Sequence, residues 1–216
     1  MVQKFAVLDI ETTGLNYMEK EITQIAIVLL NEEFEEESTF DTYVQIEAQS
    51  IPEYITELTG IKKEDTVNGM SKEELKGVLK YLLDGRIIIA QNAAFDLSFI
   101  EDLMQESYDF MDLQAMSLVY HPNEKANLDE QAKRYGLTFK HHDALEDAKV
   151  TTELLEIYME KERTPFAEMP KGLMSRFLNY LIVRQNRPML KIPNKAEVID
   201  VFAEGGAVYS VLQSAR

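Results

Sequence analysis

Short apolar segments follow one another along this chain in an order that leaves few folds open. Three of them begin the sequence, at residues 4–10, 21–31 and 39–46, separated only by short turn-prone or acidic breaks. Consecutive strands with short connections are typical of an antiparallel meander. The acidic run at 32–37 is typical of a solvated turn between two of these strands.

Helical patterns and further apolar segments alternate through the middle of the chain. Ser71 followed by Glu74 is a capping-box pattern, and Gly60 and Gly136 stand where helices would end. The expected helices cover 52–59, 71–83, 128–135 and 144–161, with another from Asp96 onward, and the expected strands cover 86–90 and 109–113. Strands that come first and then alternate with helices predict a mixed α/β sheet flanked by helices.

The sign of the charge changes near Thr164 and Pro165. The whole chain has a net charge of −16, yet residues 165–216 hold more Lys and Arg than Asp and Glu. We therefore expect one domain at 1–164 and a short basic C-terminal extension at 165–216, with a helix at 173–183 and a hairpin around 204–206. Three interpretations of the extension stay open, namely packing onto the acidic domain, docking of a partner protein and contact with nucleic acid.

Two carboxylates end the first predicted strand. Asp9 and Glu11 occupy alternate positions, so both side chains leave the same face. Such a pair at the end of an apolar strand is costly unless a positive charge lies between the two groups, and a hard divalent cation is the natural partner. Alone, the pattern also fits a pair of acids that faces solvent.

Two further acids and a histidine lie at the starts of predicted helices. Asp96 follows the strand at 86–90, and Asp147 lies in the long helix at 144–161 beside small residues that allow close packing. Either acid alone also fits a residue that stabilises a helix N-terminus. Together with Asp9 and Glu11 they carry a charge of about −4, which two Mg²⁺ or Mn²⁺ ions would balance. His142, on the entry loop, is the candidate general base, and His141 is its rival.

Four ordered segments carry a family resemblance. They are FAVLDIETTGL at 5–15, LTGI at 58–61, NAAFD at 92–96 and H-x-A-x-x-D at 142–147. In this order they resemble the DEDDh family of 3′→5′ exonucleases, which includes the proofreading epsilon subunit of bacterial DNA polymerase III. The resemblance covers about residues 3–161 and implies an RNase H-like fold.

The resemblance also implies roles for individual residues. Asp9, Glu11, Asp96 and Asp147 match metal ligands for two divalent cations, and His142 matches the general base. Thr12, Thr13, Gly14 and Leu15 match positions that bind the terminal nucleotide through backbone contacts and an apolar wedge, and Thr59 matches a further substrate-side position.

These features predict a metal-dependent 3′→5′ exonuclease that releases nucleoside 5′-monophosphates from single-stranded DNA or frayed primer 3′ ends, in proofreading or repair. A small-RNA exoribonuclease of the same fold and a non-catalytic replication-complex module remain alternatives. A polymerase or other replication partner could dock through residues 165–216.

The composition of the chain limits its cellular location and the kinds of site it can hold. The chain has no Cys, so disulfides and thiolate sites are excluded. Its start is no signal peptide, and no apolar run reaches the length of a membrane span, so we expect a cytoplasmic location. The negative charge disfavours a protein that grips long duplexes by charge alone.

Overall fold

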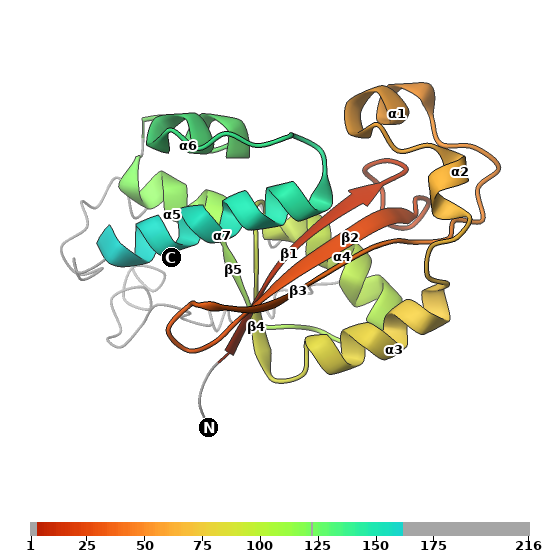
Figure 1. Cartoon of the computed structure of the whole chain (residues 1–216), viewed down its shortest axis with the longest axis horizontal. Coiled ribbons are helices and arrows are strands. Elements are labelled where there is room, and N and C mark those ends of the chain that lie inside the picture. The colour runs from red at the N-terminus through yellow and green to blue at the C-terminus, as the bar shows by residue number, and fades with distance from the viewer. Residues whose placement is uncertain (1–3, 122, 162–216) are drawn as a thin grey trace, which may run out of the picture.

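A five-stranded mixed sheet forms the centre of the computed structural model, which describes residues 4–121 and 123–161 (Figure 1). Its strands are β1 (Lys4–Thr12), β2 (Ile22–Leu30), β3 (Glu36–Tyr43), β4 (Arg86–Ala90) and β5 (Phe110–Asp112). They lie in the order β3-β2-β1-β4-β5. The first three strands pair antiparallel, and β1–β4 and β4–β5 pair parallel. The predicted meander and mixed α/β sheet are confirmed.

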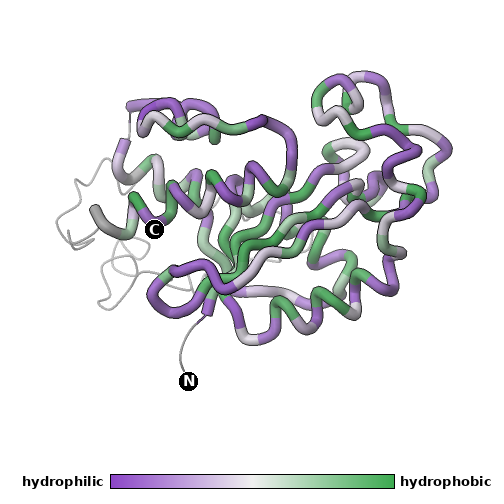
Figure 2. The backbone as a smooth tube through the Cα atoms, viewed as in Figure 1, coloured by the Kyte–Doolittle hydropathy of each residue, from purple (hydrophilic) through white to green (hydrophobic). Residues whose placement is uncertain are grey.

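Helices cover both faces of the sheet and one end of it (Figure 1). They are α1 (Glu53–Thr59), α2 (Lys63–Thr66), α3 (Lys72–Leu82), α4 (Ala93–Met104), α5 (Leu113–Tyr120), α6 (Leu128–Tyr135) and α7 (Ala144–Lys161). The face with α3 and α4 and the face with α5, α6 and α7 each hold a hydrophobic cluster. Apolar residues accordingly dominate β1, β2 and β4, whereas the edge strand β3 is largely polar and the outer helices alternate in hydropathy (Figure 2).

Alternation along β1 divides its side chains between the two faces. Ala6 and Leu8 pack in the cluster of α3 and α4, and Phe5 and Val7 pack in the cluster of α7. Successive strand residues point to opposite faces, so the residues that continue the second row, at positions 9 and 11, are directed toward α7.

Several helices begin or end at the capping residues that the sequence predicts. Ser71 and Glu74 form the capping box at the start of α3, in which the Ser71 side chain accepts from the Glu74 N–H. Gly60 and Gly136 end α1 and α6 in the left-handed conformation that glycine adopts without a steric penalty.

The acidic run before β3 corrects one prediction. β3 begins at Glu36, three residues earlier than the predicted strand, so the solvated turn is shorter than expected. The reason is ion pairing with two residues that are distant in sequence, because the Glu37 carboxylate lies 2.6 Å from Lys4 Nζ and 3.2 Å from Arg86 Nη2. These contacts allow a carboxylate to occupy a strand position next to the sheet edge.

Two short helices are absent from the sequence-based prediction. α2 is a single turn, too short to show a periodic pattern. α5 is apolar on nearly every side, and its N-terminus is capped by Asp112, which is also the last residue of β5, the strand predicted at 109–113. In addition, α4 begins at Ala93 rather than at Asp96.

The helix and hairpin predicted at 173–183 and 204–206 lie outside the described residues. Within residues 4–121 and 123–161, no helix combines the length and the apolar character needed to cross a membrane.

Candidate active site

The side chains of Asp9 and Glu11 lie near the C-terminal end of β1, on the face of the sheet that α7 covers. Both continue the row of Phe5 and Val7, which packs against α7. Glu11 is only 9% exposed, and its register partner on β2 is Gln24. Two acids are thus directed from one strand into a largely buried space.

Asp96 reaches the same end of the sheet from the first turn of α4. Its side chain is buried, and its Oδ1 accepts a hydrogen bond of 3.3 Å from the N–H of Ile10, the residue between Asp9 and Glu11. This bond ties the start of α4 to β1 and places a third carboxylate beside the first two.

Asp147 completes the group from the first turn of α7. Ligand atoms of Glu11, His142 and Asp147 all lie within 4.8 Å of one another. Asp147 is buried, and its Oδ1 has no hydrogen-bond partner in the structure. Asp9 and Asp96 stand outside this closest trio, although they are coupled to it through their charges.

Burial and mutual repulsion raise the pKa of all four carboxyl groups. Burial raises the pKa of Glu11 to about 8, with added repulsion from Asp147. Burial also raises the pKa of Asp147 to about 7. The pKa values of Asp9 and Asp96 lie well above the ordinary aspartate value, mainly through burial, and the Asp96 charge acts on Asp9. Adjacent ionised acids in such a setting require a compensating cation.

The donor set fits divalent cations with a preference for oxygen ligands. Several carboxylates converge from β1, α4 and α7, and the unpartnered Oδ1 of Asp147 is a buried acceptor that a metal ion would satisfy. Among these residues, His142 supplies a nitrogen at the edge of the group.

His142 lies on the loop that leads into α7, in a strained backbone conformation. Its φ is 59°, in the left-handed region that a residue with a side chain rarely adopts. Its side chain is half-buried, and burial followed by the charge of His141 lowers its pKa. The imidazole is therefore neutral, and able to accept a proton, at neutral pH.

The rival His141 faces elsewhere. Its Nδ1 forms an ion pair with Asp129 of α6, and its ring packs edge-on against Phe139. Of the two neighbouring histidines, only His142 belongs to the trio with Glu11 and Asp147.

The Thr12–Leu15 segment forms a tight loop beside the carboxylates. The Thr12 hydroxyl donates to the Gly14 carbonyl, and the Thr13 hydroxyl accepts from the Glu21 N–H. The φ of Gly14 is 155°, a backbone conformation that residues with a side chain rarely adopt, so this position favours glycine. Leu15 is 85% exposed, as an apolar wedge would be.

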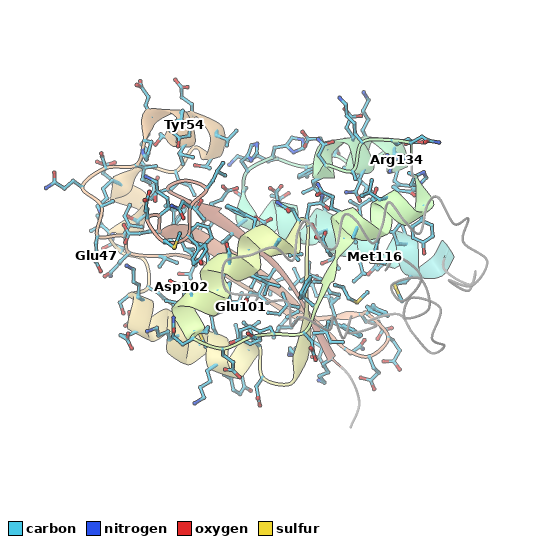
Figure 3. All side chains as sticks on the ribbon, turned by 180° about the vertical axis from the view of Figure 1, so that it is seen from behind. Glu47, Tyr54, Glu101, Asp102, Met116 and Arg134 are labelled. Carbon is cyan, nitrogen blue, oxygen red and sulfur yellow. The ribbon has the colours of Figure 1, made fainter. Side chains whose placement is uncertain are left out.

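Thr59 is buried at the end of α1, and its hydroxyl is used inside the protein. It donates to the Ile55 carbonyl and accepts from the Ile61 N–H. The Thr59 side chain therefore stabilises the C-terminal end of α1. Any substrate contact at this position would come from the residues next to Thr59. Tyr54, on the same helix, and Arg134, on α6, lie toward opposite ends of the molecule (Figure 3).

Two buried polar residues near the site escaped the sequence analysis. Asp112 caps α5 through the N–H groups of Gln114 and Ala115, and its charge raises the pKa of Asp96. Its position at the end of β5, directly before α5, was the available signal. Gln24 is a single amide within an otherwise apolar strand, and that interruption is the signal that could have marked it.

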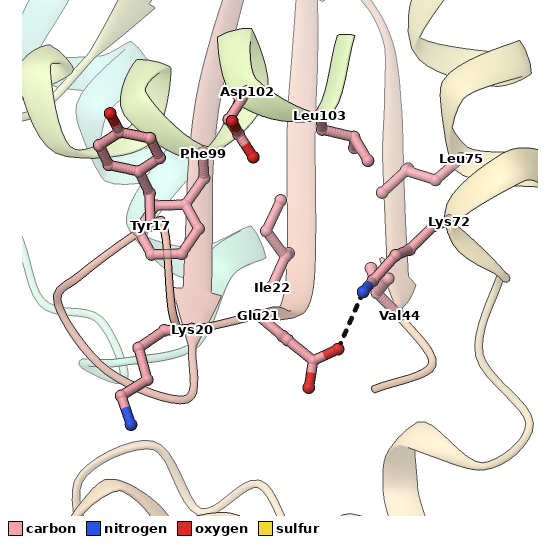
Figure 4. A pocket seen from close by; sticks show the side chains of 10 residues that line it. All are labelled: Tyr17, Lys20, Glu21, Ile22, Val44, Lys72, Leu75, Phe99, Asp102 and Leu103. Carbon is pink, nitrogen blue, oxygen red and sulfur yellow. Dashed lines mark ion pairs between the residues drawn. The ribbon is translucent and has the colours of Figure 1, made fainter. Parts of the chain in front are cut away.

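A separate cavity of about 120 Å³ lies on the opposite face of the sheet (Figure 4). Its apolar lining includes Ile22, Leu75 and Phe99 of the α3–α4 cluster. At its mouth, Lys72 Nζ lies 3.0 Å from the Glu21 carboxylate. The cavity shares no residue with the carboxylate group.

Comparisons with known proteins agree with this arrangement. A family model described as Exonuclease, of the RNase T type, matches residues 6–155. The chain is 32% identical over 166 residues to the PolC-type DNA polymerase III of Caldanaerobacter subterraneus, and 31% identical over 165 residues to the 3′-5′ exonuclease DinG of Staphylococcus saprophyticus. Each match covers 73% of this chain but only 12% and 18% of the two relatives.

Solved structures share the fold at low sequence identity. E. coli Exonuclease I in complex with a dA16 oligonucleotide superposes with a TM-score of 0.66 at 17% identity, covering 85% of this chain and 44% of that one. Exonuclease X in complex with 5′ overhanging duplex DNA gives a TM-score of 0.62 at 19% identity, covering 78% and 99%.

The matched residues include β1 with Asp9 and Glu11, α4 with Asp96 and the part of α7 that carries Asp147. The predicted RNase H-like fold and the predicted family are both confirmed, and the chain belongs to the RNase T-type exonuclease family.

Proposed function

We propose that this protein is a metal-dependent 3′→5′ exonuclease that releases nucleoside 5′-monophosphates from single-stranded DNA or frayed 3′ ends. One observation carries the proposal: Glu11 of β1 and Asp147 of α7 meet His142 with ligand atoms within 4.8 Å of one another, and the Asp147 carboxylate retains an unpartnered buried oxygen. Relatives named as a polymerase and as a 3′-5′ exonuclease support replication or repair as the setting.

The chain supplies ligands, a base and a place for the terminal nucleotide. Asp9, Glu11, Asp96 and Asp147 would hold two divalent cations, Mg²⁺ or Mn²⁺. When bound, such a pair stabilises the charge that develops on the attacking and leaving oxygens of a phosphoryl displacement. His142, neutral at pH 7, accepts the proton of the attacking water at an imidazole nitrogen.

The Thr12–Leu15 loop positions the substrate end beside these groups. Its hydrogen bonds hold the backbone rigid, and the exposed Leu15 side chain is available to wedge against the last base. Because such a site holds only the terminal nucleotides, an acidic protein can act on a polyanion, the bound cations neutralising the scissile phosphate.

A gel assay tests the proposal directly. Oligonucleotides of DNA and RNA, labelled at the 3′ or the 5′ end, are incubated with the protein and Mg²⁺, Mn²⁺ or EDTA. We expect stepwise shortening from the 3′ end of DNA, no cleavage in EDTA, and loss of hydrolysis in Asp147→Ala and Asp9→Ala with the fold retained. Asp102→Ala, which removes an acid on the opposite face, is the matched control.

Each contrary result has a distinct meaning. Metal-dependent cleavage that persists in Asp147→Ala contradicts the assigned site. Preferential shortening of RNA favours the exoribonuclease alternative, and the absence of cleavage of either polymer favours a binding module.

A further inference from the structure

Gln24 occupies a central position on the sheet face that carries the acids. On β2 it is paired in register with Glu11 of β1 on one side and with Tyr43 of β3 on the other. Its side chain is only 5% exposed, so its amide must find partners within the protein.

Both ends of this amide are engaged, and their direction is determined. The Nε2 group donates to the Asp41 Oδ1 at 3.0 Å, and the Oε1 accepts from the Ala144 N–H at 3.4 Å. An ionised carboxylate only accepts hydrogen bonds, so Asp41 requires the NH₂ group of Gln24 and turns its carbonyl oxygen toward Ala144.

Ala144 is the first residue of α7, and its N–H has no partner within the helix. Asp143 serves the next donors, since its Oδ1 accepts from the Glu146 N–H and its carbonyl accepts from the Asp147 N–H. Gln24 therefore supplies a side-chain hydrogen bond from the sheet to the beginning of the helix, beside the apolar packing of Ala144 and Ala148.

This contact lies between the two catalytic segments. His142 precedes Ala144 by two residues, and Asp147 follows it by three. We infer that Gln24, oriented by Asp41, is a positioning residue that holds the start of α7 against β2 and so keeps His142 and Asp147 at Glu11. The inference rests on the proposed function for its link to catalysis.

The length of the hydrogen bond to Ala144 indicates what its loss should change. At 3.4 Å it is a long hydrogen bond, and the apolar packing of Ala144 remains when it is lost. We therefore expect its loss to displace the start of α7, and with it the metal ligands, while the protein stays folded. Groups that orient metal ligands commonly affect metal affinity by about 10- to 100-fold.

The test compares Gln24→Met with a matched buried amide. Gln131 on α6 is also buried, and its amide contacts Gln91, the Ala126 carbonyl and Tyr158. Gln131→Met thus removes a buried glutamine of the same kind, whose hydrogen-bond partners include neither Asp41 nor Ala144. A rescue variant, Gln24→Glu with Asp41→Asn, keeps an acceptor for Ala144 and supplies an amide donor to orient it.

Three readouts are measured on the full chain. Calorimetric titration of the metal-free protein with Mn²⁺ should show about tenfold weaker binding for Gln24→Met. Hydrogen exchange of the Ala144 amide should be accelerated at least about tenfold in the same variant, and kcat should fall about tenfold while KM for an oligonucleotide stays within about twofold. Gln131→Met should lower the melting temperature yet keep the Mn²⁺ affinity, and the rescue variant should recover most of the lost affinity.

The inference is overturned if Gln24→Met binds Mn²⁺ and protects the Ala144 amide as the wild type does, or if Gln131→Met weakens Mn²⁺ binding equally. Failure of the proposed function has a different signature. A wild-type protein that hydrolyses no substrate contradicts the exonuclease proposal, while Mn²⁺ affinity and Ala144 exchange still decide the role of Gln24.

Discussion

At the scale of single residues, the grouped carboxyls make the metal-free protein sensitive to alkali. The pKa of Glu11 rises from 4.5 in the unfolded chain to about 8 in the fold, and that of Asp147 rises from 3.8 to about 7. Between these values the folded state binds more protons than the unfolded state, so its stability falls as pH increases. Acids with a lowered pKa, such as Glu74 beside Ser71, titrate below this window.

We therefore expect the melting temperature of the EDTA-treated protein to fall by roughly 5 °C or more between pH 6 and pH 8. Saturating Mg²⁺ should abolish this decrease, because bound cations favour the ionised acids. Thermal unfolding followed by circular dichroism at several pH values measures both effects. A melting temperature that is constant over this range without metal would contradict the raised pKa values.

The second residue-scale prediction concerns His142. Burial lowers its pKa below 6.5, so a general base at this position loses activity only as pH falls below that value. His142→Ala should lower kcat by about 10²- to 10⁴-fold and remove the acid limb of the pH–rate profile. His141→Ala, whose partner is Asp129, is the control and should retain that limb. An unchanged profile in His142→Ala would exclude it as the base.

The positions of candidate site residues could be predicted from the sequence where residue type and strand alternation determine them. Asp9 and Glu11 could be assigned to one face because strand alternation is strict, and the structure places them so. Gln24 and Asp112 could not be found in this way, because their importance comes from hydrogen bonds across the fold. The left-handed backbone of His142 likewise has no sequence signal, since glycine is absent there.

At the scale of elements, helix ends were predictable where a local motif specifies them. The Ser71–Glu74 capping box begins α3, and its side chains form both reciprocal hydrogen bonds. By contrast, the start of β3 depends on ion pairs with Lys4 and Arg86, which are distant in sequence. α5 escaped prediction because an almost wholly apolar helix lacks the periodic pattern that marks a surface helix.

Ser71→Ala tests the capping box as an independent element. Removing the hydroxyl leaves the Glu74 N–H without its side-chain acceptor, and we expect a loss of about 1 kcal/mol in the free energy of unfolding. Urea denaturation measures this loss. Hydrolysis should be unaffected, because α3 packs on the face opposite the carboxylates; Ser71→Asp, which keeps a cap, should restore most of the stability. Equal stability of Ser71→Ala and wild type would contradict the expectation.

At the scale of the whole molecule, the change of charge near residue 164 separates a proposed catalytic domain from a basic extension. The family match ends at residue 155, before this boundary. We expect the fragment 1–164 to unfold cooperatively and to hydrolyse a short oligonucleotide within about twofold of the full-chain rate, because every site residue lies within it.

Parallel assays on short and long oligonucleotides, compared with those of the full chain, measure this prediction. A selective loss of affinity for the long substrate would assign nucleic-acid contact to residues 165–216. A fragment that fails to fold would contradict the domain boundary and favour an extension that packs on the domain.

The central place of β1 has a consequence for how long the acids stay together when the protein fluctuates. Along Lys4–Val7, β1 is paired on both sides and packs in both hydrophobic clusters, so we expect the amides of this stretch to open only when most of the fold opens with them. Loops and helix ends can fray while Asp9 and Glu11 keep their places. Beyond Val7, where the pairing with β4 ends, Asp9 and Glu11 stay paired with Ala26 and Gln24 of β2, so the β1 side of the site is anchored in the sheet, and α7 with its entry loop provides the more adaptable side.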